Sequence, residues 1–201
     1  MKVLIYGDSN VWGDNFNTNK RLEDNKQWVN ILKNKLPDYT LYQQGMPGRL
    51  AGNLDLKAYK NGQDSFPAIF RTIAPIDVVI IALGSNDLQL KYNRTLEDIT
   101  TDLLWYKEEL KRIFADERDR EKFFKNKFPK IYYILPINFD YENEVKNIFN
   151  FSKEEIRIKL RETMCNENLI ILENASLSDG IHLSEEGHMQ MANKVYEVLS
   201  K

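Results

Sequence analysis

The chain has 201 residues, of which 42% are hydrophobic and 29% charged, and its net charge at pH 7 is −2. This length suits one domain, so we expect a single domain over residues 1–201. So small a net charge gives no electrostatic reason to expect nucleic acid or an anionic membrane as a partner. No stretch approaches the roughly 18 apolar residues of a membrane span, and the single cysteine, Cys165, agrees with a reducing compartment. The sequence therefore predicts a cytoplasmic protein with neither a membrane nor a nucleic acid as partner.

Five short apolar runs predict the strands of a parallel sheet. Two of them are continuous rather than alternating, which is typical of strands covered on both faces. The runs are residues 3–6, 39–43, 77–83, 130–135 and 169–172. Helical patterns separate them, at residues 27–36, 66–73 and 96–114, after 152 and after 184. The alternation predicts an α/β fold with a doubly wound, flavodoxin-like parallel sheet. The charge-dense residues 115–130 are expected to form a solvated helix extension or loop.

Polar or glycine-rich turns follow four of the predicted strands. They are residues 7–10, 45–49, 84–87 and 179–182. In doubly wound sheets ligands bind outside the carboxyl ends of the strands, and these four turns lie at those ends. Together they contain Ser, Asn, Asp and His side chains, so the sequence predicts one composite site at this edge of the sheet.

The residues of these turns suit acyl transfer through a serine. Asp179 precedes His182 by three residues, so its carboxylate can accept the Nδ1–H bond and leave Nε2 as a base. Ser9 lies at a strand-to-helix turn, where backbone N–H groups favour a developing negative charge. The backbone N–H of Gly48 and the side-chain amide of Asn86 are candidate donors to an oxyanion. The sequence thus predicts a serine esterase site.

The same residues resemble the signature blocks of the SGNH, or GDSL-type, hydrolases. The blocks occur in the family's order and span nearly the whole chain, as Gly7-Asp8-Ser9, Gly48, Gly84-x-Asn86-Asp87 and Asp179-x-x-His182. The resemblance is closer to the bacterial arylesterase-like acyl hydrolases, whose opening block carries Trp three residues past the serine, as residues 7–13 do here.

This resemblance implies a three-layer α/β/α fold and an esterase site without cofactor or metal. It implies that Ser9 is the nucleophile and that Asp179 and His182 are its partners. The backbone N–H groups of Ser9 and Gly48 and the Asn86 amide would form the oxyanion hole.

The resemblance also suggests substrate-binding residues. Trp12 would line the acyl pocket and favour short acyl chains, although it could instead serve only in packing. Arg49, beside Gly48, could be a solvated charge or a substrate clamp, and we place it at the rim of the site. Asn10 departs from the family, because many members have Leu at this position. Since it flanks the nucleophile, this change bears more on substrate fit than on activity.

The expected reaction is hydrolysis of small carboxylic esters with short acyl, aryl or acetylated carbohydrate groups, through an acyl-serine intermediate. Some relatives pass the acyl group to other acceptors, and relatives often form oligomers, so acyltransferase side activity and a homo-oligomer are further expectations. One alternative is a thioesterase or lysophospholipase with the same Ser-His-Asp machinery. Another is a non-catalytic carbohydrate-binding or nucleotide-binding domain of the same fold.

Two other residues near these motifs have simpler interpretations. Asp87 is expected to hold its turn by accepting backbone N–H bonds rather than to take part in chemistry. His188 and Asp179 lack a recognised metal-ligand spacing, which argues against a metal site.

Overall fold

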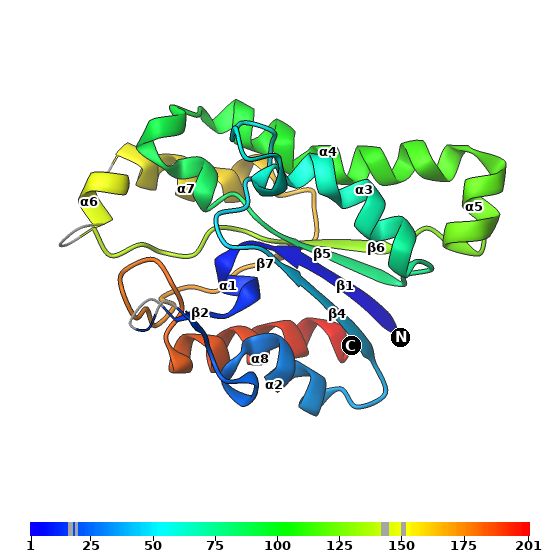
Figure 1. The fold of residues 1–201 in the computed structure, drawn as a ribbon, viewed down its shortest axis with the longest axis horizontal. Coiled ribbons are helices and arrows are strands. Elements are labelled where there is room, and N and C mark those ends of the chain that lie inside the picture. Colours follow the sequence, from blue (N-terminus) through cyan, green and yellow to red (C-terminus); the bar gives the residue numbers. More distant parts are fainter. Residues whose placement is uncertain (16–17, 19, 142–144, 150–151) are drawn as a thin grey trace.

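A five-stranded parallel sheet forms the middle layer of the molecule (Figure 1). The computed structural model describes residues 1–15, 18, 20–141, 145–149 and 152–201. The strand order is β4-β1-β5-β6-β7, and all four neighbouring pairs are parallel. The strands are β1 (Lys2–Gly7), β4 (Thr40–Gly45), β5 (Val78–Ala82), β6 (Lys130–Ile134) and β7 (Leu169–Ile170). This topology confirms the predicted doubly wound sheet.

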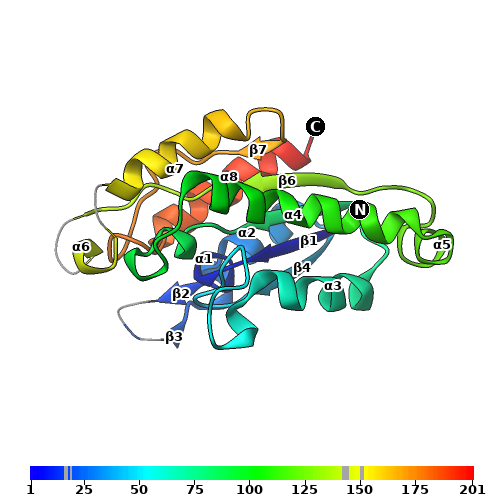
Figure 2. The same ribbon diagram turned by 90° about the horizontal axis from the view of Figure 1, so that it is seen from above.

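Helices cover both faces of the sheet (Figures 1 and 2). On one face lie α2 (Trp28–Lys35) and α8 (Glu185–Leu199), and on the other lie α3 (Gly62–Ile73), α4 (Leu96–Ala115) and α7 (Ser152–Thr163). In β1, Val3 and Ile5 pack towards α2 and α8, while Leu4 and Tyr6 join the core beneath α3 and α4. Successive side chains of a strand point to opposite faces, which explains why the run is continuously apolar.

The remaining helices and strands are short. The helices are α1 (Ser9–Trp12), α5 (Glu117–Phe124) and α6 (Val145–Ile148). Four 3-10 turns are Asp24–Lys26, Ala58–Lys60, Asn86–Leu88 and Leu90–Tyr92. A small antiparallel pair, β2 (Asp14–Asn15) with β3 (Lys20–Arg21), follows α1 and was not predicted. Within the part of the chain that the structure describes, no helix has both the length and the apolar character that a membrane crossing requires.

Residues 115–130 include a helix and are mostly exposed, as predicted, but they also contribute to the core. They contain α5, and Phe124 of this helix is buried in the core. Its ring packs edge-on against Phe114 at a centroid distance of 5.1 Å and stacks on Phe128 at 6.1 Å. This aromatic contact was not predicted, because most residues of α5 are charged.

The strand register brings the candidate site together. Gly7 at the end of β1 lies opposite Gly45 of β4 and Ala82 of β5, so these three strands end at the same level. The turns that follow them therefore begin side by side. From β1 the chain passes to β4 on one side and then crosses to β5 on the other, so the strand order reverses between β1 and β5. Doubly wound folds bind their ligands at this position.

Phe66 of α3 provides a test of the core. It is fully buried, with its ring centroid 5.2 Å from that of Tyr6 and 5.0 Å from that of Tyr106. We predict that Phe66→Ala lowers the free energy of unfolding by about 3–5 kcal/mol, because it removes buried contacts and leaves a cavity. Urea denaturation followed by circular dichroism measures this change. The control Leu56→Ala, at a fully exposed side chain, should stay within about 0.5 kcal/mol of wild type, and equal losses in both variants would contradict the prediction.

Candidate active site

Ser9 lies at the start of α1, directly beyond the carboxyl end of β1. Asp8 caps this short helix, and its carboxylate accepts the backbone N–H of Asn10 at 3.0 Å. The turn needs a glycine before it, because a Cβ on Gly7 would lie 2.3 Å from the Val11 side chain and 2.7 Å from the Ala82 carbonyl oxygen. This close packing of α1 on the sheet fixes where the Ser9 hydroxyl points.

The structure brings Ser9, His182 and Asp179 into one hydrogen-bonded series. His182 Nε2 lies 3.1 Å from Ser9 Oγ, and His182 Nδ1 lies 2.6 Å from Asp179 Oδ2. The other carboxylate oxygen of Asp179 accepts the backbone N–H groups of Ile181 and His182. Asp179 is thereby fixed to the loop that it shares with His182, and the imidazole is held with Nδ1 towards the carboxylate and Nε2 towards the hydroxyl.

The charges around His182 favour the imidazolium form. Burial alone would lower the pKa of His182, but the hydrogen bond and charge of Asp179, together with the charges of Asp14 and Asp8, outweigh it and raise the pKa. Burial likewise tends to raise the pKa of Asp179, whereas its bonds from the His182 side chain and backbone lower it overall. The pair is therefore suited to accept a proton at Nε2 while Asp179 stays ionised.

The two other oxyanion-hole candidates lie on the neighbouring turns. Gly48 follows β4 with φ of +75°, a left-handed conformation that favours glycine. The Asn86 side chain donates to the Arg49 carbonyl at 3.2 Å, and its oxygen accepts the amide of Gln89 at 2.8 Å. A carboxamide carries two N–H groups, so the amide fixed in this way can offer its second hydrogen to a ligand.

A cleft of about 160 Å³ opens beside Ser9 and His182. Its polar wall comes from the turns after β1 and β5 and includes Asn86 and Gln89. Its apolar wall is formed by Ile148, Phe149 and Ile181. Ile148 and Phe149 were not predicted as site residues, and their one signal in the sequence is that they form an adjacent apolar pair in the segment that follows β6.

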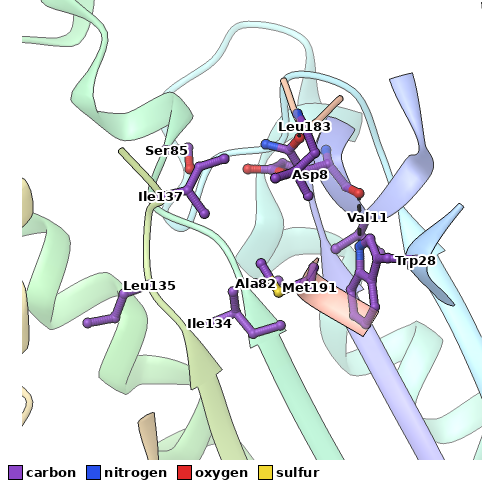
Figure 3. A pocket seen from close by; sticks show the side chains of 11 residues that line it. Asp8, Val11, Trp28, Ala82, Ser85, Ile134, Leu135, Ile137, Leu183 and Met191 are labelled. Atoms are coloured by element: carbon purple, nitrogen blue, oxygen red, sulfur yellow. Dashed lines mark hydrogen bonds between the residues drawn. The ribbon is translucent and has the colours of Figure 1, made fainter. Parts of the chain in front are cut away.

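A second, much smaller cavity is lined by Asp8 and Asn10, the residues on either side of Ser9 in the sequence, among others (Figure 3). Its volume of about 30 Å³ is enough for roughly one water molecule. Asp8 and Ser85 contribute polar atoms to a wall that is otherwise mostly apolar, with Trp28 and Met191 below them. Asp8 is 4% exposed, and burial raises the pKa of its carboxyl to about 6.

The structure does not place Trp12 or Arg49 at the cleft beside Ser9. Trp12 is not among the described residues that line it, and its ring instead faces the Arg21 guanidinium, 5.8 Å away. Arg49 is 3% exposed, so our prediction of a position at the rim was wrong. Its Nη1 donates to the Gly7 and Gln44 carbonyls at 3.0 and 2.5 Å.

The buried guanidinium of Arg49 holds neighbouring strands together instead of facing the cleft. It lies 4.1 Å from the centre of the Tyr6 ring, and it joins the ends of β1 and β4 through the two carbonyls. The carbonyl of Arg49 also accepts the Asn86 amide. Arg49 thus connects the three strand ends that carry Ser9, Gly48 and Asn86.

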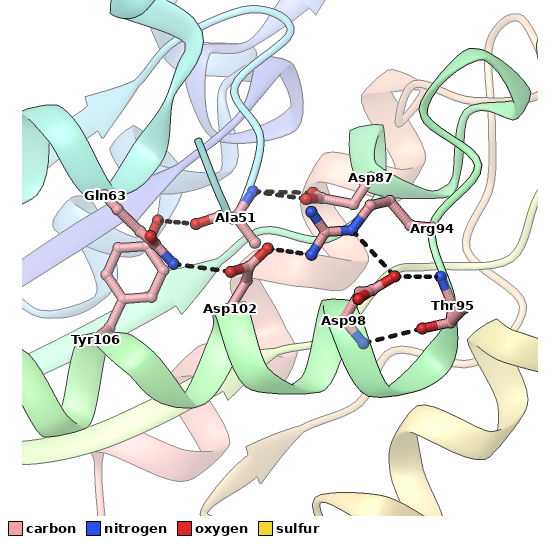
Figure 4. Close-up of polar contacts among 8 residues, drawn as sticks. All are labelled: Ala51, Gln63, Asp87, Arg94, Thr95, Asp98, Asp102 and Tyr106. Atoms are coloured by element: carbon pink, nitrogen blue, oxygen red, sulfur yellow. Dashed lines mark hydrogen bonds and ion pairs between the residues drawn. The ribbon is translucent and has the colours of Figure 1, made fainter. Parts of the chain in front are cut away.

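Asp87 holds the loop that follows β4 through its bonds to Ala51 (Figure 4). It is fully buried, and its two carboxylate oxygens accept the Ala51 N–H at 2.9 and 3.1 Å. The Ala51 carbonyl in turn accepts the Tyr106 hydroxyl at 2.7 Å. Asp87 accepts a backbone N–H, as predicted, but this N–H belongs to the loop after β4 and not to the turn of Asp87 itself. Burial raises the pKa of the Asp87 carboxyl to about 6.

His188 takes part in the packing of the core. His188 is fully buried, and its Nδ1 accepts the Trp28 backbone N–H at 3.2 Å. Among the residues that the structure describes, no three His, Cys, Asp or Glu side chains are grouped so that they could hold a metal ion.

A hydroxyl, an imidazole and a carboxylate in series, beside candidate oxyanion donors, are the arrangement of a serine hydrolase. The chain matches the model of the GDSL-like lipase/acylhydrolase family over residues 3–195, and it belongs to this family. It is therefore a carboxylic ester hydrolase, as the sequence predicted. No curated protein sequence matches it significantly.

Solved structures of esterases share its fold. Est24, a carbohydrate acetylesterase from Sinorhizobium meliloti, superposes with a TM-score of 0.82 at 19% identity, over 99% of this chain and 98% of that one. An inhibitor-bound aryl esterase from M. smegmatis gives the same TM-score, identity and coverage of both chains. A further carbohydrate acetylesterase family member from S. meliloti has a TM-score of 0.83 at 22% identity, over 98% of this chain and 96% of that one.

The pKa values of the two histidines of the chain should be shifted in opposite directions from the ordinary value. We predict a midpoint above the ordinary value of about 6.5 for His182 and of about 4 for His188, because burial and the nearby His182 lower the pKa of His188 more than Glu185 raises it. Asp179→Asn should move the His182 midpoint downwards, since burial remains and the negative charge is lost. Proton NMR of the imidazole resonances measures both values, with His188 as the internal control. A His182 midpoint that Asp179→Asn leaves unchanged would contradict this account.

Proposed function

We propose that this protein hydrolyses small carboxylic esters through a covalent acyl intermediate on Ser9, with His182 as general base and Asp179 as its orienting partner. The observation that carries this proposal is the series of contacts from Ser9 Oγ to His182 Nε2 at 3.1 Å and from His182 Nδ1 to Asp179 Oδ2 at 2.6 Å. Distances in this range allow proton transfer from the hydroxyl to the imidazole.

The first half-reaction acylates Ser9. Its hydroxyl proton passes to His182 Nε2 as the Oγ–carbon bond forms and the substrate carbonyl oxygen takes the negative charge. The tetrahedral species collapses by breaking the ester C–O bond, and the leaving alcohol takes the proton from His182. Asp179 remains a carboxylate and holds the Nδ1–H bond throughout.

The second half-reaction releases the acid. A water molecule gives a proton to His182 Nε2 and attacks the acyl carbon, and Ser9 Oγ leaves and takes that proton back. An alcohol in place of water would accept the acyl group by the same steps, which accounts for an acyltransferase side activity. In both halves the Ser9 N–H, the Gly48 N–H and the Asn86 amide would stabilise the oxyanion.

The size of the cleft supports short acyl groups. Its volume of about 160 Å³ is below the roughly 300–1,000 Å³ of pockets for drug-sized ligands. The apolar wall of Ile148, Phe149 and Ile181 suits a short acyl chain or an aryl group. This volume favours short-chain, aryl or acetylated carbohydrate esters over the long acyl chains of lysophospholipase and thioesterase substrates. The aryl esterase and acetylesterase names of the structural neighbours are consistent with this choice.

The proposal also covers the cellular compartment and the assembly of the enzyme. We place the enzyme in the cytoplasm as one domain over residues 1–201 that assembles as a homo-oligomer. The single cysteine, Cys165, is exposed as a free thiol, which suits a reducing compartment. Light scattering during gel filtration tests the assembly.

Ser9→Ala tests the nucleophile. We predict that it lowers kcat for p-nitrophenyl acetate at least about 1,000-fold, because no covalent intermediate can form. Across p-nitrophenyl esters from acetate to octanoate, the turnover of the wild type should fall with chain length because the cleft is small.

Ser85→Ala is the matched control, since Ser85 is a second serine that lines the same cleft. A fluorophosphonate should label wild type and Ser85→Ala stoichiometrically and should leave Ser9→Ala unlabelled. Labelling of Ser9→Ala, or loss of labelling in Ser85→Ala alone, would overturn the assignment.

Asn86→Ala tests the oxyanion hole. We predict a fall in kcat of about 100- to 1,000-fold with little change in KM, because the amide stabilises the oxyanion more than the substrate carbonyl. Gln89→Ala is a graded control: it removes one of the two bonds that orient the Asn86 amide and leaves the bond to the Arg49 carbonyl, so its effect should be smaller. Equal losses in the two variants, or a change confined to KM, would argue against this role of Asn86.

A further inference from the structure

Two parallel hydrogen bonds join the turn of the nucleophile to the loop of the base. Ser9 Oγ lies 3.1 Å from His182 Nε2, and the Asn10 side-chain oxygen accepts the backbone N–H of Leu183 at 2.9 Å. Two consecutive residues of one turn are thus bonded to two consecutive residues of another turn, and the partners in each bond are 173 positions apart in the sequence. Only the first of these bonds involves atoms that react.

Hydrogen bonds fix both polar groups of the Asn10 backbone. Its backbone N–H donates to the Asp8 carboxylate at 3.0 Å, and its carbonyl accepts the Trp28 indole N–H at 3.0 Å. Trp28 is itself 1% exposed in the core between the sheet and α8. The backbone of Asn10 is therefore fixed by Asp8 and by the packed interior, and its side chain extends from this fixed point to Leu183.

The bonded partner of Asn10 fixes the backbone of His182. The Leu183 N–H belongs to the peptide group that follows His182, and the carbonyl of that group accepts the Ser178 N–H at 2.9 Å. The Leu183 side chain is 1% exposed and packs into the core. Asn10 and Ser178 thus hold the two polar atoms of one peptide group, and the imidazole is placed from there.

We propose that Asn10 is a positioning residue whose bond to Leu183 keeps His182 in place while Ser9 carries the acyl group. This inference rests on the acyl-serine mechanism proposed above. Once Ser9 Oγ is esterified, it has no proton to donate to His182 Nε2, so the bond between those two atoms is lost. The bond from Leu183 to Asn10 involves no reacting atom and persists, and it holds Nε2 where it can take a proton from the incoming water.

The consequence is that loss of the Asn10 bond affects the two half-reactions unequally. Acylation begins with the Ser9–His182 hydrogen bond intact, so that bond itself aligns the base. Deacylation begins without it and depends on how the His182 backbone is held. A purely structural role of Asn10 would instead slow both steps alike or lower only the stability.

Asn10→Leu is the most direct test, because leucine has nearly the same shape and no hydrogen-bond acceptor. Stopped-flow kinetics with p-nitrophenyl acetate separates the burst of nitrophenolate, which reports acylation, from the slow phase, which reports deacylation. We expect the acylation rate to stay within about threefold of wild type and the deacylation rate to fall about 10- to 100-fold, as for misplacement of a catalytic group. Asn10→Ser, whose side chain is too short to reach Leu183, should give the same pattern and replaces Asn10→Leu if that variant does not fold.

Asn10→Asp is the rescue variant, because aspartate keeps an oxygen acceptor in the same place. Deacylation should return to within about threefold of wild type at high pH, since the bond that positions His182 is restored. Its acid limb should move to higher pH, because a new carboxylate near His182 stabilises the imidazolium.

Asn138→Leu is the matched control. Asn138 makes the same kind of bond between two loops, its side-chain oxygen accepting the Ala175 N–H at 2.7 Å. This variant should lose stability but keep the wild-type ratio of deacylation to acylation rates.

Three outcomes would overturn the inference. They are an equal fall of both rates in Asn10→Leu, no fall of the deacylation rate, and an Asn10→Asp variant as slow as Asn10→Leu. A wild type that shows neither a burst nor fluorophosphonate labelling overturns the proposed function, and this inference with it. If the wild type shows a normal burst but Asn10→Leu slows acylation and deacylation equally, only the role of Asn10 is overturned.

Discussion

The contact between His182 Nε2 and Ser9 Oγ is the interaction that the rest of the site depends on. It joins residues 173 positions apart, so neither local helix formation nor a local turn can produce it. It forms because parallel strands carry their carboxyl ends to one edge of the sheet, where the turns after β1 and β5 face the loop that follows β7. The chemistry of this family therefore depends on the whole sheet rather than on any single element.

Buried and half-buried polar groups hold these turns at the required distances. Arg49 bonds to the ends of β1 and β4, Asp87 fixes Ala51, and Asn10 fixes Leu183. In each case the partner is a backbone group, which a buried loop must satisfy in any event. The same bonds that satisfy the backbone thus also place the hydroxyl, the imidazole and the amide. Loss of such a bond would leave a buried polar group unpaired and would displace a functional group together with it.

Much of the fold and the triad could be predicted from the sequence, because both leave local marks. Continuous apolar runs show where the buried strands lie, and the polar turns after them show which edge carries the site. Other features depend on contacts that no local pattern contains. A charged side chain is normally exposed, so only the tertiary structure shows that strand-end carbonyls bury Arg49. Phe124 of α5 and the apolar wall at Ile148 likewise depend on what packs against them.

The central claim is that the ester's acyl group passes through Ser9. Its most direct measurement is mass spectrometry of the protein mixed with p-nitrophenyl acetate, quenched in acid within the burst phase and digested. The acyl-serine mechanism predicts one added acetyl group on the peptide that contains Ser9, which disappears as the substrate is exhausted and is absent in Ser9→Ala. Hydrolysis at the wild-type rate with no acetyl group on that peptide, or with one that persists after turnover ends, would contradict it.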